Sequence, residues 1–245
     1  MAYRKYLGVV MLAFSLLGGC NGLSLEQALQ AGLEVNQAIL QNSEATYSQA
    51  IKETLELSSS RAAQLLSEPG GYSGNPAYKI AMPEQLDTVT GALRAFGLGG
   101  QIDEVESLMN QGAEAAAVEA KAVFIDAVRQ MSISDALGII QGSDTAATEY
   151  FESRTESILR QRYQPIIESH LSKVGFYNEY QAFLTTYNRL PIANKPELDL
   201  QQHVLRESLR GLFAQVAREE ALIRKDPIGK GSAFLGSVFG SQPGS

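Results

Sequence analysis

The chain has 245 residues, of which 20 are basic and 27 acidic, and its formal net charge is −7. This acidic balance argues against nucleic-acid binding and against electrostatic attachment to an anionic membrane, because both need clustered Lys and Arg. With one cysteine in the sequence, no disulfide can form within the chain, so the fold must rest on packing.

The first twenty residues have the layout of a secretory signal. Arg4 and Lys5 provide a basic start, residues 7–17 (LGVVMLAFSLL) are apolar, and two glycines precede Cys20. The apolar run is shorter than the roughly 20 residues that span a bilayer. We expect cleavage before Cys20. The absence of charge between Lys5 and Glu26 leaves an uncut signal anchor as the alternative.

The stretch LGGC, residues 17–20, resembles a bacterial lipobox. The resemblance implies that the Cys20 sulfur receives a diacylglyceryl group and that the new amino terminus is acylated, as by palmitate. An ordinary free or buried cysteine is the alternative. Two or three acyl chains would hold the protein at a membrane, because each buried methylene contributes about 0.8 kcal/mol. Asn21, where inner-membrane lipoproteins usually have Asp, implies the periplasmic face of the outer membrane.

Helical patterns then follow one another along the chain. Apolar spacing and capping residues predict helices over 24–41 and 46–67. Residues 68–83 are dense in Gly and Pro and predict a loop, with a short extended segment at 78–82. Pro83 suits the first turn of a helix reaching Phe96.

The second half continues this pattern. We expect an alanine-rich helix over 102–131, in which Gly112 lets another helix approach closely, a short helix over 132–141 with a Ser132–Asp135 capping box, and a helix over 144–163. Pro165 predicts a kink or restart. Further helices are predicted over 176–190 and 199–225, the latter capped by Asp199, and a short final one over 232–240.

These elements predict an all-α protein, a single bundle-like domain of about eight to ten helices after a cleaved signal peptide. The expected division is a signal peptide at 1–19, a lipidated start and spacer or first helix at 20–45, the helical domain at 46–240, and a disordered tail at 241–245. Cleavage would remove Arg4 and Lys5 and leave 18 basic against 27 acidic residues, a charge of −9.

Several stretches, among them GLGGQIDEVESLMNQGAEAA and EAKAVFIDAVRQMSISDALGIIQGSDTAATEYF, resemble the bacterial family catalogued as domain of unknown function 4197. The resemblance covers about residues 50–240 and is most specific over 97–151. It implies an all-helical lipoprotein or secreted protein with no assigned activity. Gln111, Gly112 and Tyr163 depart from the family pattern, as does the stretch before the last apolar run.

The sequence contains few residue patterns that are typical of a catalytic site. A lipidated Cys20 cannot act as a nucleophile. The two histidines, His170 and His203, lie on predicted helices without a glycine-flanked serine nearby, and surface or boundary positions are expected for both. A helical di-metal site needs Glu three residues before His, and those positions hold Ile167 and Leu200. We therefore predict no metal and no cofactor, and an enzyme is left open but disfavoured.

One polar constellation is a candidate site. Asp103, Glu106, Asn110 and Glu114 recur every three or four residues and share one helix face. Such carboxylates can perform acid–base chemistry or hold a cation. A solvated face is the simpler interpretation, and burial beside Arg94 or Arg129 would instead indicate a structural polar network.

The expected function is a non-enzymatic binding or scaffolding module of the cell envelope, held at the outer membrane by Cys20, with an envelope protein as the expected kind of partner. Two alternatives remain. An aromatic set could line a cavity for an apolar ligand, although such residues more often form the core; the set comprises Tyr150, Phe151, Tyr163, Phe176, Tyr177, Tyr180, Phe183 and Tyr187. The other alternative, an enzyme using the polar face, is less favoured. Oligomeric state is not predicted.

Overall fold

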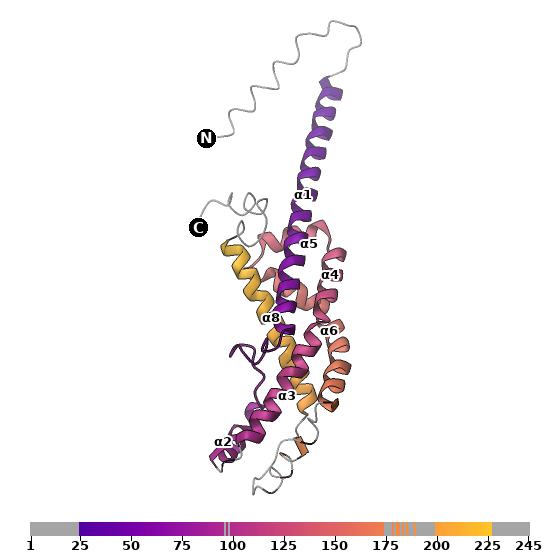
Figure 1. Cartoon of the computed structure of the whole chain (residues 1–245). Coiled ribbons are helices and arrows are strands. Elements are labelled where there is room, and N and C mark those ends of the chain that lie inside the picture. Colours follow the sequence, from indigo (N-terminus) through magenta and orange to yellow (C-terminus); the bar gives the residue numbers. More distant parts are fainter. Residues whose placement is uncertain are drawn as a thin grey trace. The chain divides into compact units, whose positions relative to one another are not determined.

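The structure is a computed structural model in which the described residues are helical or irregular and contain no strand, so the predicted all-α class is confirmed (Figure 1). It describes residues 25–95, 97, 99–173, 178, 180, 181, 183, 185, 189 and 199–226. The helices are α1 (Leu25–Ser67), the 3-10 turn η1 (Glu84–Leu86), α2 (Asp87–Ala95), α3 (Gly99–Ala117), α4 (Ala120–Gln130), α5 (Ile133–Gln141), α6 (Ala146–Lys173) and α8 (Leu200–Lys225).

The chain divides into two compact units, Met1–Ser43 and Glu44–Ser245. In the first unit, residues 25–43 are helical and belong to α1. In the second unit, one continuous hydrophobic cluster contains buried residues from α1 through α8. The second unit is therefore a single all-α domain with one core.

The described residues form fewer helices than the eight to ten predicted from the sequence. Two predicted helices, 24–41 and 46–67, are one continuous α1, because residues 42–45 (NSEA) contain no Gly or Pro to stop it. Similarly, α6 runs through Pro165. Buried residues on both sides of this proline, Tyr163 and Ile167, lie on one helix face, and their packing holds the helix together.

The prediction of a single helix over 102–131 is also wrong, because the structure has two helices there. Two helices, α3 and α4, replace it and meet at a turn over Val118 and Glu119, where the Glu119 N–H donates to the Ala116 carbonyl oxygen at 3.1 Å. Val118 is exposed, whereas Phe124 in α4 is fully buried. The turn redirects the chain so that α4 can bury its apolar face, and the alanine-rich sequence contains no local stop signal that would have revealed it.

Several local predictions are confirmed. Residues 68–83 form a long loop without regular secondary structure. Ser132 and Asp135 form a capping box at the start of α5, and the Asp199 side chain accepts from the Gln202 N–H at the start of α8. These signals act within three or four residues, so they operate independently of the tertiary fold.

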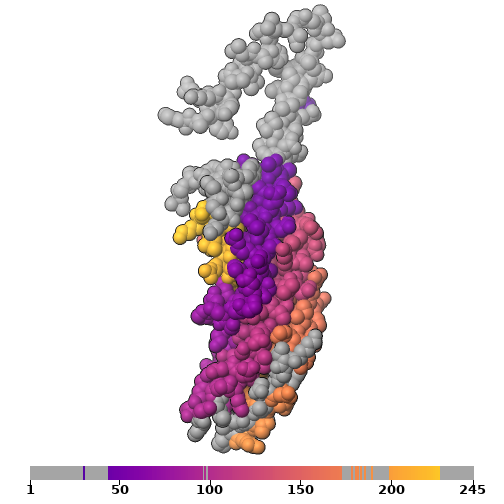
Figure 2. All heavy atoms as spheres, in the orientation of Figure 1, coloured from indigo at the N-terminus to yellow at the C-terminus, as the bar shows by residue number. Residues whose placement is uncertain are grey.

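Helix α6 packs most extensively against α3 and α8. Gly112 lies at the α3–α6 contact, where a Cβ atom would sit 3.3 Å from Leu171 Cδ2, so the predicted close helix approach is confirmed. Of the aromatic set, Phe151, Tyr163 and Phe183 are core residues, and the rings of Phe124 and Phe151 lie 5.0 Å apart. On the face shown in Figure 2, the part of α1 after Glu44 lies beside α4 and α5, and α3 continues that face.

Several predictions concern residues outside the described part of the chain. These are the signal peptide, the lipidation of Cys20, the final helix over 232–240 and the tail at 241–245. Most of the predicted helix at 176–190 also falls there, although the described positions within it are helical. Among the described residues, no helix combines the length and apolarity that crossing a membrane requires.

Candidate functional site

The predicted polar face lies along α3 and faces the loop of residues 68–83. We call this segment the clasped loop, because side chains of α3 and α8 hold its backbone at several points. Glu106, Asn110 and Glu114 follow one another at intervals of four residues on α3, and each is at most 8% exposed. Three polar side chains in the core require partners, since a buried polar group without one destabilises the fold. The loop backbone supplies those partners.

Asn110 is at the centre of this arrangement. Its Oδ1 accepts from the Ile80 N–H at 2.9 Å, and its Nδ2 donates to the Ile80 carbonyl oxygen at 2.8 Å and to the Glu106 carbonyl oxygen at 2.7 Å. The amide thus satisfies both backbone groups of Ile80, as a neighbouring strand would. The sequence predicted extended chain here, and a side chain of α3 takes the place of the missing strand partner.

Glu106 binds the end of the clasped loop. One oxygen, Oε1, accepts from the Met82 N–H at 3.1 Å, and the other, Oε2, lies 3.1 Å from the Lys79 ammonium nitrogen. Lys79 is half exposed, so this ion pair connects the buried carboxylate to the surface. A buried carboxylate with both oxygens engaged in this way is compensated for its loss of hydration.

Glu114 binds the beginning of the clasped loop. Its Oε1 accepts from the N–H groups of Gly70 and Tyr72, at 3.1 and 3.3 Å. Gly70 has a φ of +85°, a backbone conformation that glycine adopts without strain. The turn at Gly70 points two amides of the loop toward the same oxygen, and a carboxylate is well suited to accept from both.

Helix α8 holds the clasped loop from another side. The Tyr72 hydroxyl donates to the Ser208 carbonyl oxygen at 2.8 Å, and the Tyr72 ring is fully buried. Gly211 makes room for that ring, because a Cβ atom there would lie 2.8 Å from Tyr72 Cε1. The loop is therefore fastened between two helices that are far apart in the sequence.

His203 on α8 adds a further contact to the loop. Its Nε2 lies 2.8 Å from the Ala81 carbonyl oxygen, and its Nδ1 lies 3.0 Å from Nη2 of Arg206. A carbonyl can only accept and a guanidinium can only donate, so this geometry suits the tautomer in which Nε2 donates to Ala81 and Nδ1 accepts from Arg206. His203 is 8% exposed, which corrects the expectation of a surface or boundary position. The other histidine, His170, is half-buried, and its Nε2 has no hydrogen-bond partner among the described residues.

The fourth residue of the predicted face, Asp103, does not join this cluster. Its carboxylate pairs with Arg94 of α2 at 2.7 Å, and its side chain is 62% exposed. The solvated-face interpretation therefore fits Asp103 alone. The structural-network interpretation fits the other three residues, although their partners are loop amides rather than Arg94 or Arg129.

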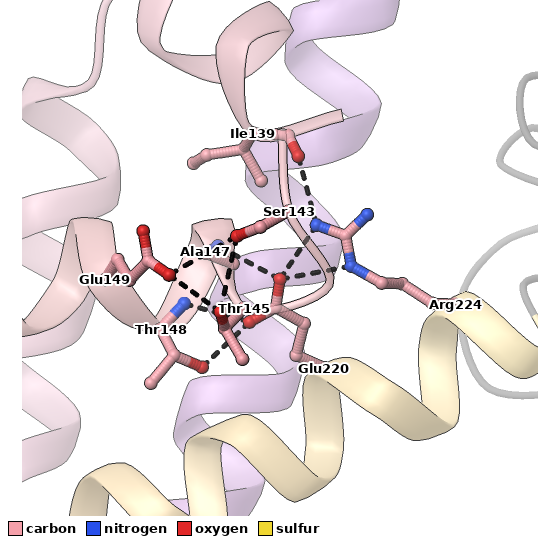
Figure 3. Close-up of polar contacts among 8 residues, drawn as sticks. All are labelled: Ile139, Ser143, Thr145, Ala147, Thr148, Glu149, Glu220 and Arg224. Atoms are coloured by element: carbon pink, nitrogen blue, oxygen red, sulfur yellow. Dashed lines mark hydrogen bonds and ion pairs between the residues drawn. The ribbon is translucent and has the colours of Figure 1, made fainter. Parts of the chain in front are cut away.

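A second buried carboxylate, Glu220 of α8, caps the start of α6 (Figure 3). Its oxygens accept from the N–H groups of Ala147 and Thr148 at 3.0 and 2.9 Å and from the Thr148 hydroxyl at 2.8 Å. Arg224, one turn further along α8, donates to Glu220 at 2.8 Å and to the Ile139 carbonyl oxygen near the end of α5 at 3.0 Å. This pair on α8 joins the end of α5 to the start of α6 by binding backbone groups at those two helix ends.

The sequence analysis did not identify Glu220, although a signal for it exists. Val216 and Ile223 are core residues of α8, and Glu220 lies four residues after one and three before the other. A carboxylate at that position falls on the apolar stripe of the helix and must be buried. Its neighbour Glu219 is also buried and pairs with Gln215 at 3.0 Å and with Arg61 at 3.7 Å.

The ionisation of the described groups follows from these surroundings. Burial raises the pKa of Tyr72, and the charge of Glu114 raises it further, so Tyr72 is a hydrogen-bond donor at neutral pH. Burial likewise raises the pKa of Tyr163, whose hydroxyl has no hydrogen-bond partner in the described part of the chain. For Glu207, partial burial favours the neutral form, but the hydrogen bonds and charges of Arg210 and Arg206 outweigh it and lower the pKa.

The buried carboxylates of this region are bound to backbone amides. Among the described residues, no group of three or more Asp, Glu, His or Cys side chains is placed to hold a metal ion. Glu106, Glu114 and Glu220 each accept from backbone amides, which occupies lone pairs that a ligand or a proton transfer would need. The candidate site is best described as a scaffold that fixes the clasped loop.

One cavity in the described part of the chain is apolar. It holds about 40 Å³ and is lined by residues of α1, α5, α6 and α8, including Ile51, Leu55, Ile139, Phe151 and Ile223. Small-molecule sites usually occupy about 300–1,000 Å³. Larger hollows near the clasped loop and along α6 and α8 have charged residues such as Lys79, Arg206, Glu207 and Arg210 around them.

The family comparison covers most of the chain. Residues 41–240 match the family described as "Protein of unknown function (DUF4197)". Neither the curated proteins nor the solved structures contain a significant match to this chain. The matched region includes α3, the clasped loop and α8, so it contains every residue of the site described above. The chain belongs to the DUF4197 family.

Proposed function

We propose that this protein is a non-enzymatic binding or scaffolding module of the cell envelope, anchored through a lipidated Cys20 at the periplasmic face of the outer membrane. In this proposal the clasped loop is the recognition surface, and α3 and α8 are its support. The partner is an envelope protein. No catalytic role is assigned to the buried carboxylates.

The observation that carries this proposal is the use of three buried side chains of α3 to hold one irregular loop. A loop of this length is uncommon in a compact domain unless it has a function, and binding residues are frequently found on loops held by a rigid scaffold. Here the bonds from Glu114, Asn110 and Glu106 reach the loop at both ends. Ser73 and Ala77, between those attachment points, remain exposed.

The proposed location rests on the sequence. The apolar run, the stretch LGGC and the lone cysteine favour lipidation, and Asn21 favours transport to the outer membrane. Intact mass of the protein extracted from membranes, measured beside a Cys20→Ala variant, tests this directly. We expect the mass of the chain from Cys20 plus acyl groups, and no such species in the variant. An unmodified full-length mass would rule out the anchor.

The proposed recognition surface is tested by photo-crosslinking in the envelope. A photoreactive residue placed at Ser73 or Ala77 should give a discrete adduct with an envelope protein. The matched control is the same residue at Ser153, an exposed serine on α6. Adducts of equal yield from all three positions, or none from the loop positions, would contradict the proposal.

The two alternatives receive less support. An apolar-ligand carrier needs a cavity larger than the one of about 40 Å³ that is lined almost entirely by apolar groups, and the hollow of about 480 Å³ along α6 and α8 has Arg206, Glu207 and Arg210 around it. A carboxylate enzyme needs Asp103 to act together with Glu106 and Glu114, but Asp103 is exposed and bound to Arg94. Turnover of an envelope substrate by the purified protein, abolished by Asp103→Asn, would revive the enzyme alternative.

A further inference from the structure

The apolar cavity of about 40 Å³ lies among four helices of the second unit. Ile51 and Leu55 line it from α1, Ile139 from α5, Phe151 from α6 and Ile223 from α8. Its lining is almost entirely apolar. A water molecule needs about 10–15 Å³ of such space and also polar partners, and the polar side chains of this lining are bonded within the protein. The cavity therefore has room for a group of three or four carbon atoms, the size of an aliphatic side chain.

The four polar residues at the cavity are already engaged: Thr54 and Ser58 donate to backbone carbonyls of their own helix, and Glu220 and Arg224 bind each other. Glu220 caps α6, and Arg224 bridges Glu220 and the Ile139 carbonyl oxygen (Figure 3). Neither charge is left for a polar ligand. An occupant must therefore bind by apolar contact alone, and an aliphatic group without charge fits best.

The chain itself continues from the edge of this cavity. Helix α8 ends at Lys225, and Ile223 and Arg224, both in its last turn, line the cavity. Residues 227–245 follow, and they contain the apolar run 233–239 (AFLGSVF) with no charged residue after Lys230. An extended chain spans about 3.3–3.6 Å per residue, so Leu235 can reach up to about 30 Å from Asp226.

The family match provides an independent observation. It does not end with α8 but extends to residue 240, directly after this apolar run. The run therefore belongs to the family domain rather than to an appended tail. Leu235 and Val238 have isobutyl and isopropyl groups, which contain four and three carbon atoms and match the size of the cavity.

We propose that the apolar run 233–239 of the chain's own C-terminal segment docks on the cavity between α1, α5, α6 and α8, with Leu235 or Val238 inserted. Docking would bury apolar side chains that are otherwise left in water. Because the segment is covalently attached next to its site, its effective concentration is high, and a small contact suffices. This inference is independent of the proposed lipid anchor and of the proposed recognition loop.

A disulfide between two engineered cysteines tests the docking in the full chain. In a Cys20→Ser background, Ser58→Cys at the cavity and Leu235→Cys in the run should oxidise readily to an intramolecular disulfide, seen by mobility on a non-reducing gel. The control pairs Leu235→Cys with Ser172→Cys, an exposed position about 37 Å along α6 from the cavity residue Ala147. Disulfide bonding needs Cα atoms within about 7 Å, so the control should not cross-link. Equal cross-linking of both pairs, or none of the first, would overturn the proposal.

A thermal measurement supplies a second test that does not need cysteines. Ending the chain after Asp226 should lower Tm by about 3–8 °C, whereas the same truncation in a Thr54→Leu background should have no further effect, because leucine at this cavity position fills the space. The comparison is made within each background, so any change that Thr54→Leu itself causes cancels. An identical loss of Tm in both backgrounds, or no loss in either, would contradict docking at this cavity.

Discussion

At the residue scale, the most informative side chain is Asn110. It lies on the helix that the sequence identified, on the face that the sequence identified, and it is 1% exposed. Its amide is matched to the Ile80 backbone because it presents an acceptor and a donor side by side. No carboxylate could do the same at neutral pH, since a carboxylate cannot donate. This explains why an amide stands between two glutamates on α3.

Replacing Asn110 with Ala should therefore destabilise the fold. The Ile80 N–H and carbonyl would lose their partner in the interior, and the expected loss in the free energy of unfolding is about 2–4 kcal/mol. Gln111→Ala is the matched control, because Gln111 is exposed and bonds only to Ser107 on its own helix. Urea unfolding measures both. Similar losses for the two variants would show that Asn110 does not hold the loop.

Two carboxyl groups have lowered pKa values, and from these the change of stability in acid can be predicted. Hydrogen bonds from the Ser132 backbone and side chain lower the pKa of Asp135, and the pKa of Glu207 is lowered by Arg210 and Arg206 against the effect of burial. A lowered folded-state pKa contributes stability above the ordinary pKa, and this contribution is lost as pH falls from about 4 downward.

The Tm of the protein should therefore decrease between pH 5 and pH 3, and it should decrease less steeply in Asp135→Asn. Differential scanning calorimetry across this range measures the two slopes. Asp87→Asn is the control, because Asp87 lies in the first turn of α2 without such a capping box. The capping argument fails if Asp135→Asn and the parent protein show the same acid dependence.

At the element scale, the association of the clasped loop with α8 depends on a glycine. Gly211 is in the interior of a helix, where alanine is normally the more stable residue by up to about 1 kcal/mol. Here the Tyr72 ring occupies the space that a methyl group would need. The ring cannot easily move away, because its hydroxyl is bound to the Ser208 carbonyl oxygen and the ring is fully buried.

Gly211→Ala should thus lower the free energy of unfolding by about 1–3 kcal/mol, through overpacking against Tyr72. Gly138 in α5 offers a matched control, since a Cβ atom there would meet nothing within 4 Å. Gly138→Ala should leave stability unchanged or raise it by up to about 1 kcal/mol. Chemical denaturation compares the two. Stabilisation by Gly211→Ala would mean that the loop does not pack against α8 as described.

At the scale of the whole molecule, the core belongs to the second unit. Among the described residues, the buried apolar cluster begins at Ile51 and continues to Ile223. The family match begins at residue 41, close to the division between Ser43 and Glu44. The family match and the second compact unit both begin near here, so the domain should not depend on the residues before Gln41 for its stability.

A chain beginning at Gln41 should therefore unfold in one cooperative transition. Its Tm should lie within about 2 °C of that of the chain beginning at Asn21, since the residues removed lie before the family match and before the second compact unit. Circular dichroism at the helical wavelength follows both transitions. A fall of more than about 5 °C would show that the first unit contributes to the core.

The sequence by itself determined the helical class, the family, the loop at 68–83 and the capping residues Ser132 and Asp199. These features depend on composition or on contacts within a few residues, so they can be read without a fold. It also placed Glu106, Asn110 and Glu114 on one helix face. It could not show that this face is buried, because burial depends on what packs against it.

Only the tertiary structure decided what those residues do. Glu114 meets Tyr72 across 42 residues of sequence, Glu220 meets Thr148 across 72, and His203 meets Ala81 across 122. Local periodicity carries no information about such pairs. The same holds for the turn between α3 and α4 and for the continuous α6 at Pro165, where packing outweighed local preference. Long-range contacts made a predicted polar face into the support of an irregular loop.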